Sequence, residues 1–129
     1  MVVDTSALLA VLFKEEDAAR YLDAMVNAPE VRISAATAVE LGIVAISRAG
    51  ADAELQIDLL LARIGAIIVP VDSAMANFAR SAFRIFGKGR HRAKLNFGDC
   101  FSYALAKMTG EPLLYKGADF SETDVKAAI

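Results

Sequence analysis

The sequence predicts a three-layer α/β domain in which helices cover both faces of a mostly parallel sheet. Short apolar runs alternate along the chain with longer segments whose apolar residues recur at helical spacing. This alternation is typical of β-α-β units and therefore of parallel strands. No linker, internal repeat or low-complexity tract interrupts the 129 residues. We therefore expect one domain over residues 1–129, large enough to bury about two-thirds of its unfolded surface.

The first half of the chain contains two predicted strands and three predicted helices. Three cap-forming residues, Asp4, Thr5 and Ser6, separate an apolar start from the run ALLAVLF, which indicates a strand that passes directly into a helix. A later helix is apolar almost all round, so we expect it to be central and buried. The predicted elements are a strand at Met1–Val3, helices at Ala7–Phe13 and Glu16–Asn27, a strand at Val31–Ser34 and the apolar helix at Ala35–Ser47.

The second half repeats the alternation and ends in a tail with two readings. Gly110 is a helix stop, and Pro112 prevents the helix from resuming. The tail either starts a last helical turn at Ser121–Asp124 or adds an edge strand at Val125–Ile129. The predicted elements are a helix at Ala51–Ile64, a strand at Ala66–Val71, a helix from Asp72 to Phe86, a helix from Gly98 to Gly110 and a strand at Leu113–Tyr115. In the helix from Asp72 to Phe86, we expect the stripe that faces the core to be Met75, Phe78, Ala79, Ala82 and Phe83.

Composition limits the class of protein. Apolar residues make up 56% of the chain, and the mean hydropathy of +0.42 predicts a surface for a second subunit or partner, concentrated in the first two helices and Ala35–Ser47. No window approaches the ~18 apolar residues of a membrane span. The start lacks the basic region of a signal peptide, so we expect a cytoplasmic protein without membrane contact. A single cysteine, Cys100, excludes an internal disulfide.

Four acidic residues are expected to meet at the carboxyl edge of the sheet. Asp4 follows the first strand, and Glu40 lies about a turn and a half into the helix after the second. Asp99 opens the helix before the last strand, and Asp119 follows that strand. Sites in open α/β sheets gather at this edge. Oxygen ligands without cysteine or histidine favour Mg²⁺ or Mn²⁺, which can activate water against a phosphodiester.

Each of these residues also has a purely structural interpretation. Asp4 can be an ordinary N-cap, Glu40 can pair with an arginine, and Asp119 can stabilise a turn or cap. Thr5 and Ser6 can hydrogen-bond a ligand, a water or a phosphate, or they can serve only as cap hydroxyls.

The segment GKGRHRAK, at residues 87–94, is a basic loop that leads into Asp99. Its two glycines predict mobility, and its cations lie next to the expected acidic centre. The net charge of the whole chain is −2, so any nucleic-acid surface must be local. We expect these cations to hold a phosphate backbone, although a solvated loop is the alternative. His91 has no second ligand at zinc spacing. The cations are Arg84, Lys88, Arg90, Arg92 and Lys94.

Three segments resemble PIN-domain proteins of the VapC toxin type. They are VVDTSALLAVLF, SAATAVELGIV and GKGRHRAKLNFGDCFSYALAKMTGEPLLYKGADFSETDV, and the third is the most specific. The resemblance covers essentially the whole chain. It implies a PIN-like domain and a Mg²⁺-dependent endoribonuclease, with Mn²⁺ as the other candidate metal. It also implies a homodimer and a VapB-type antitoxin that holds the enzyme inactive.

The resemblance assigns roles to the acidic residues. The family's acidic set falls on Asp4, Glu40, Asp99 and Asp119, with Asp4 and Asp99 as direct metal ligands and Glu40 as a supporting ligand or water-orienting group. Many family members place the fourth acid directly after a Thr-Arg or similar pair, whereas Gly117 and Ala118 precede it here.

Two other functions remain open on the sequence. One is a catalytically degenerate PIN-like binding module. The other is a metal-dependent phosphatase or a phosphoaspartate-type protein on a similar sheet. Phosphoaspartyl hydrolases need a second acid two residues after the nucleophile, and two residues after Asp4 this chain has Ser6.

Overall fold

The computed structural model describes residues 1–129 and contains one four-stranded sheet, in which every strand is parallel to its neighbours. The strand order is β3-β2-β1-β4, so β1 lies inside the sheet between β2 and β4. The register pairs Val2 with Arg32 on one side and with Leu113 on the other. The strands are β1 (Val2–Val3), β2 (Val31–Ser34), β3 (Ala66–Val69) and β4 (Leu113–Leu114).

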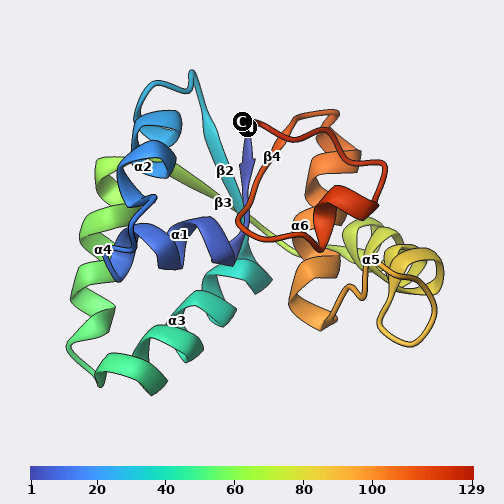
Figure 1. Ribbon diagram of the computed structural model, residues 1–129, viewed down its shortest axis with the longest axis horizontal. Coiled ribbons are helices and arrows are strands. Elements are labelled where there is room, and N and C mark those ends of the chain that lie inside the picture. Colours follow the sequence, from blue (N-terminus) through green and yellow to red (C-terminus); the bar gives the residue numbers. More distant parts are fainter.

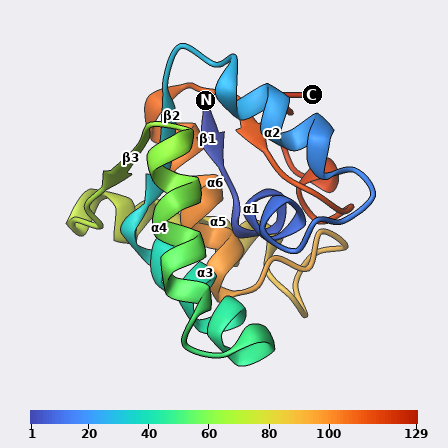
Figure 2. The same ribbon diagram turned by 90° about the vertical axis from the view of Figure 1, so that its left-hand side faces the viewer.

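Helices cover both faces of the sheet, which confirms the predicted three-layer α/β/α class (Figure 1). One layer contains α1, α2, α3 and α4, and the opposite layer contains α5 and α6, as the turned view also shows (Figure 2). No helix is long and apolar enough to cross a bilayer. The helices are α1 (Thr5–Leu12), α2 (Ala18–Val26), α3 (Ala35–Ala49), α4 (Ala53–Arg63), α5 (Ser73–Phe86), α6 (Phe97–Thr109) and the short 3₁₀ helix η1 (Phe120–Glu122).

The two short central strands supply both hydrophobic cores because successive side chains of a strand point to opposite faces. Val3 and Leu114 belong to the core beneath α1 to α4. Val2 and Leu113 belong to the core beneath α5 and α6. All four side chains are fully buried, so β1 and β4 are fixed from both faces.

The strand order places a switch point at the carboxyl edge of β1. From β1 the chain proceeds outward through β2 to β3 and then returns to the other side of β1 as β4. Ligands of open α/β sheets bind at such a point. Strands β1 and β2 also pass into α1 and α3 without a loop, because Asp4 and Ser34 act at once as strand ends and helix N-caps.

Three expectations about burial are wrong. The first is that α3 is buried all round: it buries only Thr37, Leu41 and Ala45, and it leaves Val39 62% exposed. The reason is that one face packs on α1, α4 and α6 while the rest of the helix extends beyond the sheet (Figure 1).

The second wrong expectation concerns α5. Of its predicted inner stripe, Met75, Ala79 and Ala82 are buried, but Phe78 and Phe83 are largely exposed. This follows from packing against a single neighbouring helix, α6, which covers only a narrow stripe.

The third concerns the exposed apolar surface. The prediction is right for α3, where Val39 and Ile43 are exposed, and wrong for the first two helices, where Val26 is the only large exposed apolar side chain. The remaining exposed apolar side chains lie mainly on α4, β3 and α5 with the start of α6. At the chain end both predicted features occur in reduced form, as η1 and as a single parallel bridge between Leu113 and Ala127.

Candidate active site

Asp4 is a buried carboxylate at the end of β1, and its side chain is held by three donors. Its Oδ2 accepts hydrogen bonds from the backbone N–H of Ser6 at 2.9 Å and from the Ser6 hydroxyl at 2.6 Å. Its Oδ1 accepts from the Ser102 hydroxyl at 2.6 Å. The Ser6 hydroxyl accepts in turn from the N–H of Lys116, in the loop after β4. Asp4 is therefore an N-cap, as the structural interpretation expects, and it is also tied to α6 and to the β4 loop.

Glu40 is half-buried on α3, and no cation pairs with it, which removes the predicted arginine partner. Its Oε1 accepts a hydrogen bond from the Thr5 hydroxyl at 2.5 Å. Burial raises the pKa of Glu40, and the charge of Asp4 raises it further, while the bond from Thr5 lowers it. Its Oε2 lies against Gly98, where a Cβ atom would stand 1.8 Å from it. A side chain at position 98 would therefore force the Glu40 carboxylate to move from this place.

Asp99 lies in the first turn of α6 and completes a capping box. Its Oδ2 accepts from the backbone N–H of Asn96, and its own N–H donates to the Asn96 side chain, both at 2.9 Å. Burial raises the pKa of Asp99 to about 7, although the bond from Asn96 opposes the shift. The negative charges of Asp4, Asp119 and Glu40 add to the rise. Like charges act in this way only at short range, so the four predicted acids share one electrostatic neighbourhood.

Asp119 is the exposed member of the set. It precedes η1, and its side chain makes no capping hydrogen bond there, which removes the predicted cap role. Its contribution is visible through its charge, which raises the pKa of Asp99.

The donor set suits a hard divalent cation. In the structure, no three aspartate, glutamate, histidine or cysteine side chains are arranged to hold one metal ion, because three of the carboxylates are directed at hydroxyl or amide donors. The chemistry nevertheless fits, since the set consists of carboxylate oxygens alone and its members repel one another. A cation placed among them would remove that repulsion.

The basic loop lies on the surface next to α6. A parallel bridge between Gly87 and Leu95 closes its base, and His91 organises its interior. The Nδ1 of His91 accepts a hydrogen bond from the N–H of Ala93, and the ring packs edge-on against Phe86. Arg92 pairs with Glu122 in η1 at 2.6 Å, which connects the loop to the segment that follows Asp119. The remaining predicted cations have no carboxylate partner and are exposed: Arg84, Lys88, Arg90 and Lys94.

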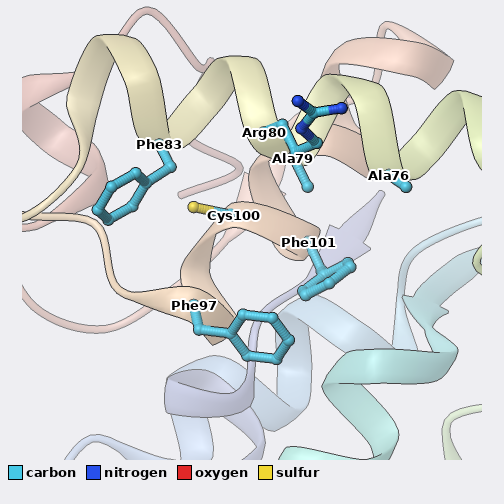
Figure 3. A pocket seen from close by; sticks show the side chains of 7 residues that line it. All are labelled: Ala76, Ala79, Arg80, Phe83, Phe97, Cys100 and Phe101. Carbon is cyan, nitrogen blue, oxygen red and sulfur yellow. The ribbon is translucent and has the colours of Figure 1, made fainter.

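An apolar cavity of about 480 Å³ opens between α5 and the first turn of α6 (Figure 3). Phe97, two residues before Asp99, is 79% exposed at its rim and packs edge-on against Phe101. Cys100 points into the cavity, and burial raises the pKa of its thiol to about 11, so the thiol stays protonated. Arg80 is the one charged lining residue.

Sequence reasoning missed the residues that hold the acids in place. Ser102 and Thr37 are polar residues at buried positions of amphipathic helices, and that pattern is the signal that would have found them. Gly98 carries no side chain, so only the approach of Glu40 reveals its role. Asn96 is recognisable as an N-cap three residues before an acid.

Replacing Gly98 with alanine tests the contact with Glu40. The new Cβ displaces a flexible carboxylate, so we expect the melting temperature in EDTA to change little while the affinity for Mn²⁺ falls several-fold. Titration calorimetry and thermal melts measure the two effects. Gly42→Ala is the matched control, because nothing lies within 4 Å of its Cβ and alanine favours a helix interior. Unchanged Mn²⁺ affinity in Gly98→Ala would contradict the assignment of Glu40 to the site.

The raised pKa of Asp99 predicts a pH-dependent stability. Between the ordinary aspartate pKa of 3.8 and about 7, the unfolded chain has released this proton while the folded, metal-free protein retains it. Stability therefore falls as pH rises through this window. Asp99→Asn cannot ionise, so its melting temperature in EDTA should exceed that of the wild type at pH 8, and the difference should disappear near pH 4. If the difference in melting temperature between the wild type and Asp99→Asn is the same at every pH in that range, the shift in the pKa of Asp99 is refuted.

The comparisons with known proteins identify the family of this chain. The family model of the PIN domain matches residues 1–126. The chain is 50% identical over 127 residues to "Ribonuclease VapC" of Mycolicibacterium smegmatis, covering 98% of both chains. It is 49% identical over 126 residues to "Ribonuclease VapC30" of Mycobacterium tuberculosis, covering 97% of this chain and 95% of the relative.

Two solved structures share the fold. The crystal structure of VapC20 of Mycobacterium tuberculosis, described as a toxin that cleaves the sarcin–ricin loop, superposes with a TM-score of 0.78 at 17% identity over 96% of this chain and 95% of that one. A toxin–antitoxin complex from Klebsiella pneumoniae superposes with a TM-score of 0.70 at 18% identity, covering 95% and 92% of the respective chains. Since the family model and the curated relatives span nearly the full length, this chain belongs to the PIN-domain family and, within it, to the VapC ribonucleases.

Proposed function

We propose that this protein is a Mg²⁺-dependent endoribonuclease, with Mn²⁺ as an alternative metal, and the toxin of a VapBC-type pair. One observation carries the proposal: four carboxylates without cationic partners influence one another at the switch point of the sheet, beside exposed cations. Carboxylates in that state need a cation, and the neighbouring cations need an anion. RNA with a divalent metal satisfies both requirements.

Each of the four acids has its own role in the proposed hydrolysis. Asp4, Asp99 and Glu40 hold the metal, which when bound supplies positive charge that polarises the phosphodiester and acidifies a water. Asp4 provides a ligand oxygen whose direction is fixed by Ser6 and Ser102. Glu40 is anchored through Oε1 by Thr5, and its carboxylate would orient the attacking water or support the metal. Asp119 supplies the fourth negative charge from the solvent side.

The basic loop binds the substrate on either side of the cleaved bond. Arg84, Lys88, Arg90 and Lys94 have no carboxylate partner, so they contact phosphates without first breaking an ion pair. Arg92 does have a partner in Glu122, and it contributes by fixing the loop as well as by contacting RNA. Guanidinium groups suit this task because their planar donors match phosphate oxygens.

The exposed apolar surfaces support the two protein partners. Val39 and Ile43 are exposed on α3, Leu55 and Leu59 are exposed on α4, and Phe97 lies beside the cavity between α5 and α6. Exposed apolar patches of this kind are typical of protein interfaces. We assign them to a VapB-type antitoxin and to a second copy of the chain.

A catalytically degenerate binding module is the second candidate. It is favoured by the lack of any three metal-ligating side chains in ligating arrangement. It predicts that the wild type itself cleaves no RNA above background, with or without Mg²⁺, so one assay separates the two functions.

Loss of either Asp4 or Asp99 should abolish cleavage. Asp4→Asn and Asp99→Asn keep the side-chain shape but remove a charge, so we expect kcat/KM on RNA to fall at least about 100-fold, or about 2.7 kcal/mol. The measurement is cleavage of total RNA with and without Mg²⁺, with mapped cut sites. Asp72→Asn is the matched control because Asp72 caps α5 away from the acids and asparagine caps equally well. Wild-type rates in both site variants would contradict the catalytic role of these acids, and a wild type that cleaves no RNA would leave only the binding module.

Removing loop cations should weaken RNA binding through electrostatics alone. For Lys88→Gln/Arg90→Gln/Lys94→Gln we expect weaker binding and a shallower dependence of log Kd on log salt, by about 0.7 for each lost phosphate contact. Fluorescence anisotropy with a single-stranded RNA at several salt concentrations measures both. Lys14→Gln/Arg63→Gln/Lys126→Gln removes the same charge elsewhere on the surface. If both triple variants show the same salt dependence, the loop is merely solvated.

A further inference from the structure

A row of buried hydroxyls ends on the Asp4 carboxylate. The protein buries only five polar or charged side chains, and four of them form this row. The Ser34 and Thr37 oxygens lie 3.0 Å apart, the Thr37 and Ser102 oxygens 3.2 Å apart, and the Ser102 hydroxyl is 2.6 Å from Asp4 Oδ1. No buried side-chain nitrogen or oxygen lacks a partner, so no member of the row is left unsatisfied.

The direction of the row follows from the number of protons. Ionised Asp4 can only accept, so Ser102 spends its single proton on Oδ1. Ser102 must then accept from Thr37, and Thr37, having used its proton, must accept from Ser34. All hydroxyls therefore point toward the carboxylate. Hydrogen bonds aligned in this way polarise one another and strengthen the last bond of the row.

The row connects the three elements that carry the predicted metal ligands. Ser34 ends β2 and caps α3, where its oxygen accepts from the N–H of Thr37 at 3.0 Å. Ser102 lies one turn after Asp99 on α6. Asp4 ends β1 and begins α1. A single chain of bonds thus sets the position of one acid relative to the helices that carry the other two.

The bonds also decide which oxygen lone pair of Asp4 remains available. A carboxylate offers about four acceptor sites, two on each oxygen. Ser6 fills both sites of Oδ2, and Ser102 fills one of Oδ1. One site remains, on Oδ1, next to the Ser102 hydroxyl.

We propose that Ser102, supported by Thr37 and Ser34, is a positioning residue that presents the remaining Oδ1 lone pair of Asp4 to the metal. This rests on the proposed nuclease function for its catalytic readout but not for its structural one. Ser102 touches neither metal nor substrate. It acts by fixing the rotation of the Asp4 carboxylate, so its loss changes catalysis more than RNA binding.

The first test compares steady-state kinetics and Mn²⁺ affinity. Ser102→Ala should lower kcat and Mn²⁺ affinity by about 10- to 100-fold, the range found when partners of metal ligands are removed, with KM changed less than about twofold. Thr37→Val keeps the shape but breaks the row one step back, so its loss should be smaller. Thr37→Ser retains the hydroxyl and should restore most of the activity. Ser47→Ala and Thr109→Val, whose hydroxyls bond to carbonyls of their own helices, are the controls.

The second test needs no metal. In EDTA, Ser102→Ala should lower the unfolding midpoint of the wild type. In the Asp4→Asn background the same substitution should lower the midpoint by less than about half as much, because the two substitutions remove the same charged hydrogen bond. Additive losses would overturn the inference. If Ser102→Ala does not fold, Thr37→Val carries both tests.

The outcomes separate this inference from the function. Active wild type with unchanged Ser102→Ala and Thr37→Val kinetics overturns the positioning role and leaves the nuclease intact. Inactive wild type that binds no Mn²⁺ overturns the nuclease and with it the proposed presentation of Oδ1 to a metal, whatever coupling the EDTA cycle reveals.

Discussion

The constraint on which this structure depends is that a negative charge must be kept in a dry interior. Asp4 is 3% exposed and has no cationic partner, so only donors from the protein stabilise its charge. Those donors come from the first turn of α1, from α6 and, through Ser6, from the loop after β4. The buried polar groups of this protein therefore gather around the proposed site.

The same constraint shapes the electrostatics of the proposed metal site. The sheet order brings the ends of β1 and β4 together, and the capping box fixes Asp99 beside them. Asp4, Glu40 and Asp99 each accept a local hydrogen bond, yet the pKa of Asp99 is raised, first by burial and then by the charges of the other acids. Folding thus brings carboxylates that repel one another to one place, where a divalent ion would reduce their repulsion.

The fold could be read from the sequence because its signals are local. Cap residues at Asp4, Ser34 and Asp72 and the stop at Gly110 placed the helices, and apolar runs placed the strands. The extent to which α3 is buried could not be predicted from the sequence, because it depends on how far the helix extends past its neighbours. The acids were recognisable as exceptions in apolar surroundings. Their supports, Ser102 and Gly98, were not, since their roles exist only through contacts with residues distant in sequence.

The contact between Glu40 on α3 and Gly98 on α6 makes the side chain at one position depend on the side chain at the other. The carboxylate of Glu40 occupies the space that a side chain at position 98 would need. Among relatives with this backbone, an alanine at 98 would accordingly displace a glutamate at 40 from this place and would fit a shorter acid better, whereas glycine at 98 leaves the glutamate in place. The two positions should therefore covary in an alignment, although 58 residues separate them.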